Sequence, residues 1–203
     1  MFRTKEECLK IMNEALNTYS YSDLVKKVEE AMQNSDKIVK SYNSKPSLYG
    51  MYYPDPVFYK YFKYRGRVTK SDKKFTYKYY YQGDKVLFTE QYSEDYDVYT
   101  GKGNGVFNLI EGIFYFYYED HVDILICNAR DNKISCVARV IYVDGKVQSF
   151  IEANVSKNSI YLYHEWVFVE NSEFLYEKFY GSFFIGDKLY ENEHEGCVKT
   201  IYA

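Results

Sequence analysis

The sequence has few of the residues and segments that mark membrane, secreted or disordered proteins. Its 203 residues include only three prolines and eleven glycines, whereas hydrophobic residues make up 46%. This composition excludes a collagenous or low-complexity chain and predicts a folded protein with a sizeable core. No apolar run approaches the roughly 18 residues of a spanning helix, and residues 1–17 lack the apolar stretch of a signal peptide. We therefore expect a cytoplasmic protein without a membrane partner.

Cysteine is also scarce. The four cysteines are Cys8, Cys127, Cys136 and Cys197. They form no C-x-x-C pair and are too few for the disulfide framework of a small secreted scaffold, so reduced thiols are expected. If Asp131 and Asn132 formed a two-residue hairpin loop, Cys127 would lie opposite Cys136, where a disulfide is geometrically feasible. Two adjacent reduced thiols are the state that we expect there.

The first 45 residues follow the period of amphipathic helices. Thr4 and Glu7 form a T-x-x-E capping box before one apolar stripe, and Ser20 or Ser22 can cap a helix with a second stripe. The stripes consist of Cys8, Ile11, Met12, Ala15, Leu16 and Tyr19, and of Leu24, Val25, Val28, Ala31, Met32 and Ile38. Because both repeat at helical spacing, we predict a helical hairpin over residues 1–45.

From about residue 56 the period changes to two, which indicates strands. Turn signals such as QGDK (82–85), VDGK (143–146) and IGDK (185–188) place Gly beside Asp between strand-like runs, as two-residue hairpin loops require. We predict an antiparallel meander of nine to eleven strands over 56–203 that curls into a half-barrel or folds into two layers. The fold class is α+β, mainly β, with residues 1–203 in a single domain.

The hairpin signals also predict registers and faces. With Asp144 and Gly145 as the loop, Tyr142 faces Val147, residue 140 faces 149 and residue 138 faces 151. The chain has 26 tyrosines, and within strands most of them alternate. We expect the side chains at 77, 79 and 81 to share one face, those at 78 and 80 to share the other, and tyrosine hydroxyls to lie at the rim of the sheet.

Several functional classes lack support in the sequence. No nucleophile motif or metal-ligand spacing surrounds His121, His164 or His194, so we expect no catalytic residue, no metal and no cofactor. GKGNG (101–105) precedes a strand instead of a helix and therefore does not match a phosphate loop. Lysines and arginines interleave with aromatics over residues 60–81, but the chain has a net charge of −3 and no RNA-binding motif. We expect no nucleic-acid partner.

Charge is distributed unevenly along the chain. Residues 51–90 carry a net charge of +5, whereas residues 91–203 carry nine Lys/Arg against eighteen Asp/Glu, a net charge of −9. We read residues 91–105, QYSEDYDVYTGKGNG, as a long irregular loop, and residues 191–195 as an acidic turn. Acidic side chains would attract a basic protein during encounter, and tyrosine rings would supply binding energy in the complex. The predicted contact residues are Tyr92, Glu94, Asp95, Tyr96, Asp97, Tyr99, Glu191, Glu193 and Glu195.

In character, the chain resembles the immunity proteins of bacterial polymorphic-toxin and contact-dependent inhibition systems. The resemblance rests on SEDYDVY (93–99), ENEHEG (191–196) and the tyrosine-rich strands, and no motif of one particular family supports it. It implies a cytoplasmic, non-enzymatic inhibitor that covers a basic toxin domain. One alternative is a curved-sheet or barrel protein that binds an apolar small molecule, because GIFYFYYEDHVDILIC (112–127) is apolar on both faces. An enzyme without a recognisable motif is the third hypothesis.

Overall fold

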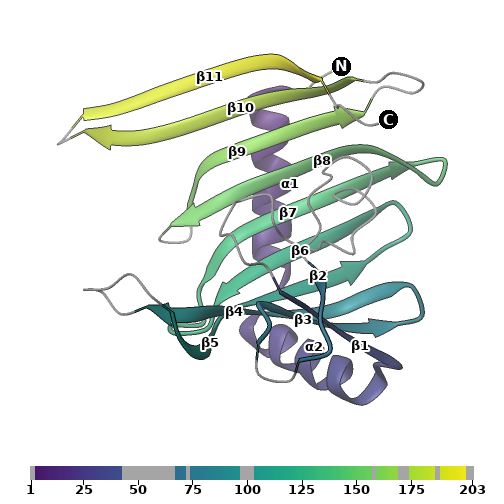
Figure 1. Ribbon diagram of the computed structural model, residues 1–203. Coiled ribbons are helices and arrows are strands. Elements are labelled where there is room, and N and C mark those ends of the chain that lie inside the picture. The colour runs from purple at the N-terminus through teal and green to yellow at the C-terminus, as the bar shows by residue number, and fades with distance from the viewer. Residues whose placement is uncertain are drawn as a thin grey trace. The chain divides into compact units, whose positions relative to one another are not determined.

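A computed structural model describes residues 3–42, 67–71, 74–96, 103–156, 159–168, 174–185 and 188–199. The helices are α1 (Lys5–Thr18) and α2 (Tyr21–Asn34). The strands are β1 (Lys37–Tyr42), β2 (Arg67–Val68), β3 (Tyr77–Gln82), β4 (Lys85–Tyr96), β5 (Gly103–Tyr117), β6 (His121–Asn128), β7 (Ile134–Val143), β8 (Lys146–Ser156), β9 (Ser159–Phe168), β10 (Phe174–Ile185) and β11 (Lys188–Lys199). These elements, drawn in Figure 1, confirm an α+β fold that is mainly β.

The described strands follow the order β11-β10-β9-β8-β7-β6-β5-β4-β3-β1-β2. Nine of the ten neighbouring pairs join strands that are consecutive in the sequence, the exception being β3 and β1. Pairs such as β3–β4, β7–β8 and β10–β11 are antiparallel. The order has two ends, so the sheet is not closed. By its contacts the chain divides into two compact units, one with residues 1–20, 116–125 and 134–203, the other with residues 21–115 and 126–133. Long strands β5 and β6 contribute residues to both.

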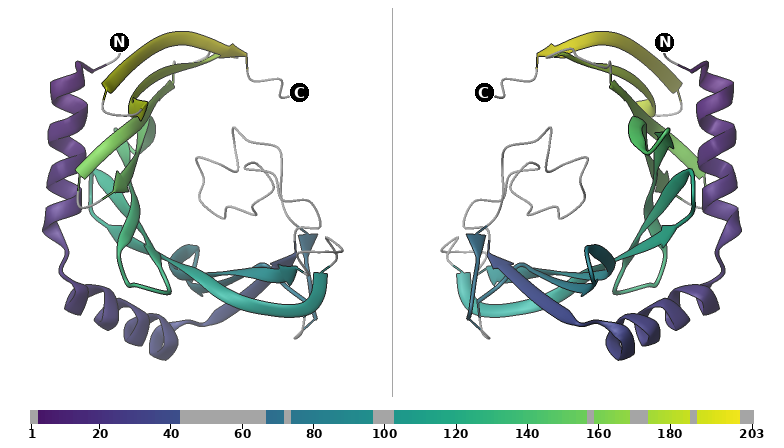
Figure 2. Two further views of the ribbon diagram at one scale, coloured as in Figure 1. Left: turned by 90° about the vertical axis from the view of Figure 1, so that its left-hand side faces the viewer. Right: turned by 90° about the vertical axis from the view of Figure 1, so that its right-hand side faces the viewer.

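In the first unit, α1 packs on β7, β8 and β9. Its start is fixed by the predicted capping box, in which Glu7 N donates to Thr4 Oγ1 (3.2 Å) and Thr4 N donates to Glu7 Oε2 (2.8 Å). The buried residues of α1 are Cys8, Met12, Ala15 and Leu16, as the predicted stripe requires. Figure 2 shows α1 on one side of these strands. Burial of this stripe attaches the helix to the sheet.

In the second unit, α2 packs on β3 and β4. Leu24 and Ala31 are buried, but Val25 and Met32 of the predicted stripe are exposed. The prediction that Ile38 extends this helix is wrong, because α2 ends at Asn34 and residues 37–42 form β1. The β-branched pair at 38–39 favours a strand, and β1 pairs with β3, so the sheet recruits residues from before position 56.

The turn residues correctly predicted the pairing next to the 144–145 turn. Bulges shift the pairing of residues that lie further along the strands. Asp144 and Gly145 have φ of 51° and 71°, as the predicted loop requires, and Tyr142 pairs with Val147. A register shift follows, so residue 140 pairs with 150 and residue 138 with 152, not with 149 and 151. The β3–β4 hairpin likewise shifts after Tyr81–Val86. Each shift adds one residue that periodicity alone cannot reveal.

The turn at 129–132 also differs from the prediction. Asn128 N donates to Lys133 O (2.9 Å), so four residues, and not two, lie between the last bonded pair of this hairpin. Asn132 takes the positive φ of 56° at the end of this loop. The expected position of Cys127 opposite Cys136 depended on the shorter loop. Both side chains are buried and neither is in a disulfide, as expected.

The tyrosine faces of β3 are confirmed. The rings of Tyr77 and Tyr79 lie 6.0 Å apart, and those of Tyr79 and Tyr81 6.5 Å apart, whereas Lys78 lies over the ring of Tyr80. The expectation of hydroxyls at the rim is wrong for Tyr115 and Tyr163, whose hydroxyl oxygens are buried. The side chain of Tyr79 is buried as well. Burial is the main reason that the pKa of Tyr79 lies well above its ordinary value. Packing therefore accounts for this group of tyrosines.

Candidate functional site

The predicted contact residues near position 92 lie on a strand, so the expected loop over 91–105 is wrong at both of its ends, and residues 97–102 lie outside the described residues. Tyr92, Glu94 and Asp95 belong to β4, and residues 103–105 already belong to β5. The Tyr92 hydroxyl donates to Glu90 Oε2 (3.1 Å), and Glu94 Oε1 accepts from Gly105 N (2.9 Å). Asp95 is exposed. Two of these three side chains therefore have partners within their own sheet.

The structure describes only some of the other predicted contact residues. Tyr96 ends β4, whereas Asp97 and Tyr99 lie outside the described residues. The acidic turn expected at 191–195 is wrong, because these residues lie within β11. Positions 191, 193 and 195 alternate along that strand and pair with positions 182, 180 and 178 of β10. Since β11 and residues 92–96 belong to different compact units, each segment is considered by itself.

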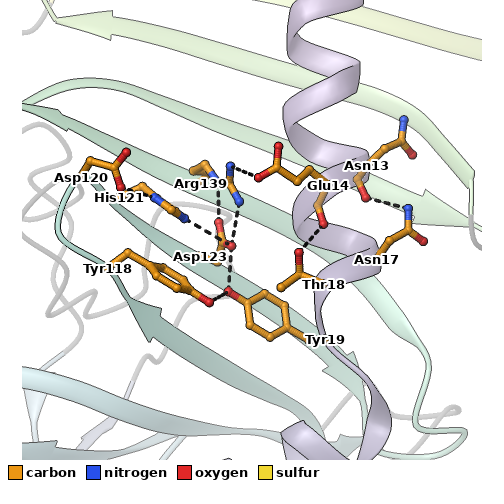
Figure 3. Close-up of polar contacts among 10 residues, drawn as sticks. All are labelled: Asn13, Glu14, Asn17, Thr18, Tyr19, Tyr118, Asp120, His121, Asp123 and Arg139. Carbon is orange, nitrogen blue, oxygen red and sulfur yellow. Dashed lines mark hydrogen bonds and ion pairs between the residues drawn. The ribbon is translucent and has the colours of Figure 1, made fainter.

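A polar cluster that the sequence did not predict lies in the first unit (Figure 3). Its centre is an ion pair between Asp123 of β6 and Arg139 of β7. The guanidinium donates twice to the carboxylate, from Nε to Oδ1 (2.6 Å) and from Nη2 to Oδ2 (2.9 Å). Only 1% of the Asp123 side chain is exposed. Burial alone would lower the pKa of Arg139, but the hydrogen bonds and charge of Asp123 outweigh it and raise that pKa.

Two tyrosines connect this ion pair to α1. Tyr19, the C-cap of α1, donates from its hydroxyl to Asp123 Oδ2 (2.8 Å) and stacks on Phe116 of β5, with ring centroids 3.9 Å apart. Its hydroxyl also forms a 2.8 Å hydrogen bond with the hydroxyl of Tyr118. Burial, and then the Tyr118 hydrogen bond, raise the pKa of Tyr19 far above its ordinary value. Tyr19 therefore remains a neutral donor.

Tyr118 begins the turn between β5 and β6, and its ring is held on two sides. It stacks on the ring of His121, with centroids 4.4 Å apart and planes inclined by 13°, while Tyr19 holds its hydroxyl. The turn itself is closed by a hydrogen bond from Tyr118 N to His121 O (2.9 Å). Even so, 48% of Tyr118 is exposed. The ring is therefore fixed in one position and remains accessible to a partner.

Exposed acids lie on the turn that carries this ring and on the segments next to it. Glu119 and Asp120 complete the turn, and Glu14 of α1 approaches Arg139 Nη1 at 3.4 Å with 60% of its side chain exposed. Tyr142 N donates to Asp120 O (2.8 Å), which brings exposed Val143 and Asp144 close to the turn. We call this set the Tyr118 surface. It comprises Glu14, Tyr118, Glu119, Asp120, Val143 and Asp144.

The net charge of the Tyr118 surface differs from that of the buried pair formed by Asp123 and Arg139. Asp123 and Arg139 neutralise each other, so the exposed carboxylates of the surface determine its charge. The hydrogen bond from His121 is the main reason that the pKa of Asp120 is lowered. The Asp120 carboxyl is therefore ionised at neutral pH. Together with a fixed tyrosine, the exposed acids offer a cationic group both electrostatic attraction and an aromatic ring to pack against.

The sequence analysis considered residues 119 and 120 only as part of the run 112–127, which it described as apolar on both faces. The local signal was YYEDHVD (117–123), which combines tyrosines with acids in the same way as the segment near Tyr92. The rest could not be read from the sequence, because Tyr19 and Asp123 are 104 positions apart. Their contact arises only when α1 packs on the sheet.

Other kinds of site find no support in the described part of the chain. Among those residues, no group of three or more His, Cys, Asp or Glu side chains could hold a metal ion. None of the helices described is long and apolar enough to cross a membrane.

Comparison with known proteins identifies no family. No family model matches the chain, and no curated protein matches it either. A crystal structure of a protein of unknown function from Bacteroides fragilis is similar over 63% of this chain and 94% of its own, with a TM-score of 0.42 and 12% sequence identity. The site is therefore interpreted from its own geometry.

Proposed function

We propose that this protein is a protein-binding inhibitor, in the manner of an immunity protein that neutralises a basic bacterial toxin domain in the cytoplasm. The observation that carries the proposal is the Tyr118 surface, where an accessible ring held by Tyr19 and His121 stands among exposed carboxylates. We further propose that the protein acts by covering its partner and not by catalysis.

The physical support comes from pre-organisation and charge. Tyrosine is enriched among residues that dominate binding energy, and a ring that is already held loses little conformational entropy on binding. Glu119, Asp120 and Asp144 would attract lysine and arginine side chains and would accelerate encounter. Basic partners are therefore favoured over acidic ones.

The contact residues predicted from the sequence remain part of the proposal. Asp95 on β4 is exposed and could be reached by a partner without rearrangement. Tyr92 and Glu94 would first have to give up their bonds to Glu90 and Gly105. We therefore rank the Tyr118 surface above the β4 segment as the principal contact.

The test begins with identification of the partner. Cross-linking in the native cell, followed by affinity purification and mass spectrometry, should recover a basic protein whose cross-links involve residues near Tyr118. The purified partner is then used for kinetics against the Y118A variant and the charge-neutral variant E119Q/D144N. Asparagine tolerates the left-handed conformation at position 144, so this change removes charge without straining the turn.

The two variants should affect different rate constants. Y118A removes the anchor and should raise the dissociation constant about 30-fold, mainly through faster dissociation. E119Q/D144N should slow association several-fold at low ionic strength, and the effect should shrink as salt rises. The matched control is E29Q/D84N, which removes the same charge from exposed positions of the other unit and should leave both rates unchanged.

Two outcomes would contradict the proposal. If no basic partner is recovered, the inhibitor function fails, and binding of an apolar small molecule becomes the leading hypothesis. If a basic partner binds but Y118A behaves like the control variant, the function stands and the Tyr118 surface is not its site.

A further inference from the structure

We infer that the exposed side of α2 is a self-association surface, on which two copies of this chain pack as an antiparallel, two-fold symmetric pair of helices. The inference concerns the second unit only and does not depend on the proposed function.

The first observation is an apolar stripe on α2 that packing within the unit leaves exposed. Tyr21, Val25, Val28 and Met32 recur at i, i+4, i+7 and i+11, and on a helix these positions lie within about 60° of one another. Tyr21 is 59% exposed, Val25 39% and Met32 57%, whereas Val28 is partly buried. Single exposed apolar residues are common on protein surfaces, but a continuous stripe of them indicates an interaction surface.

This stripe is separate from the side of α2 that packs on the sheet. Leu24 and Ala31, the buried residues of the helix, lie roughly 80° to one side of the stripe. The sheet contacts of α2 are with β3 and β4 (Figure 1). Packing on the sheet therefore explains why positions 24 and 31 are apolar, but it does not explain why positions 21, 25 and 32 are.

The second observation is a pair of opposite charges on the other side of the stripe. Lys26 and Glu29 are both exposed, and within the described part of the chain neither side chain has an ion-pair partner. Next to them, by contrast, Lys27 is paired with Glu30 at 3.0 Å. An apolar stripe bordered by one unpaired cation and one unpaired anion is complementary to a second copy of itself.

Charge then favours the antiparallel direction. If Val25 of one copy faces Val28 of the other, Lys26 lies on the same side of the pair as Glu29 of the second copy. The two positions are offset along the helix axis by about 3 Å, which the long lysine side chain can span. The two-fold axis repeats this contact, so two ion pairs border the stripe. Opposed helix macrodipoles favour the same direction.

A parallel pair would lack this complementarity. A two-fold axis along the helices would turn the Lys26 side of each helix toward the Leu24 side of the other. That side is already packed against the strands of its own unit. The antiparallel arrangement is therefore the one that uses both the stripe and its charges.

The size of the contact predicts its strength. A contact confined to one pair of 14-residue helices belongs among interfaces below about 1,200 Å², which are typical of weak and transient complexes. We expect a dissociation constant of about 10 µM or weaker. The pair would therefore be scarce at submicromolar concentrations, and it would not disturb binding kinetics measured there.

Sedimentation equilibrium of the intact chain, from about 5 to about 500 µM, tests the inference. The average mass should rise with concentration from the 24.2 kDa of one chain towards twice that value and no further. V25Q/M32Q keeps good helix formers at both positions and should raise the dissociation constant at least about tenfold. The matched control V106T/L109T replaces two exposed apolar residues of β5 in the same unit and should change nothing.

Exchange of the two charges provides a second readout. K26E and E29K each bring like charges together across the pair, and each should raise the dissociation constant about threefold at low ionic strength. K26E/E29K restores opposite charges and should associate about as tightly as the wild type. Nonspecific hydrophobic aggregation would not produce this recovery.

Four results would overturn the inference. The wild type could remain monomeric at the highest concentration, or its mass could exceed that of two chains. V25Q/M32Q could associate like the wild type, or K26E/E29K could associate no more tightly than the single variants. Urea unfolding at low concentration should give V25Q/M32Q the wild-type midpoint, which separates loss of association from loss of folding.

Discussion

Replacing Arg139 with leucine should destabilise the first unit strongly. Arg139 is the only cation that donates to Asp123 among the described contacts, through bonds of 2.6 and 2.9 Å, and the Asp123 side chain is almost fully buried. In R139L this buried carboxylate loses the guanidinium that donates to it. Removing one partner of a buried ion pair typically costs about 3–5 kcal/mol. Because the Tyr19 hydroxyl still donates to Asp123, we expect the lower part of this range, about 3 kcal/mol.

The measurement is urea unfolding followed by circular dichroism at neutral pH, on a double-mutant cycle. D123N/R139L removes both charges and leaves an acceptor for Tyr19, so it should be at least about 1 kcal/mol more stable than R139L. The control is K133L, which breaks an exposed pair with Asp131 and should cost less than about 1 kcal/mol. The reasoning is refuted if R139L costs no more than K133L, or if the double variant is less stable than R139L.

Three further predictions concern other parts of the fold. E165A should lower the free energy of unfolding by about 3 kcal/mol in the same assay, because Glu165 is fully buried and forms a 2.6 Å ion pair with Arg3; a loss below 1 kcal/mol would contradict the role of this pair. G145A should cost about 1 kcal/mol, since φ is 71° there and no atom obstructs a Cβ, so strain alone acts. Burial and Glu90 raise the pKa of Tyr92 to about 12, so Y92F should remove one phenol from the ultraviolet titration near pH 12 and leave the steps near pH 10 unchanged.

Local signals in the sequence predicted the elements of this fold where local energetics decide them. The Thr4 capping box and the glycine of the 144–145 turn act through bonds within a few residues, and both were identified. Ile38 was misassigned because its strand exists only through pairing with β3. The acidic residues 191–195 were misassigned for a similar reason, since poor strand formers are tolerated where a long neighbouring strand pairs with them.

The candidate site was less predictable than the fold. The sequence predicted a surface that combines tyrosines with acids, and the Tyr118 surface has this composition. The sequence analysis, however, located that surface near Tyr92. What distinguishes the two segments is the partner of each ring. Tyr92 is bonded to Glu90 on its own strand, whereas Tyr118 is held by α1 from the far end of the sequence. Contacts between residues so far apart in the sequence form only when the chain packs, and the spacing of apolar residues along one sequence does not predict them.

The bulge in the β7–β8 hairpin contains one extra residue, which determines the side of the sheet that the following side chains of β8 face. Tyr142 pairs with Val147 and Ile141 with Ser149, so Gln148 has no residue opposite it on β7. Every residue of β8 beyond it, including buried Ile151 and Ala153, takes its side of the sheet from this single insertion. If Gln148 entered the ladder instead of the bulge, residue 140 would pair with 149 and residue 138 with 151, and inside and outside would exchange along the strand. Deleting Gln148 would, in contrast, keep Tyr142 opposite Val147 and Ile141 opposite Ser149, and would remove only the bulge and the twist that it adds.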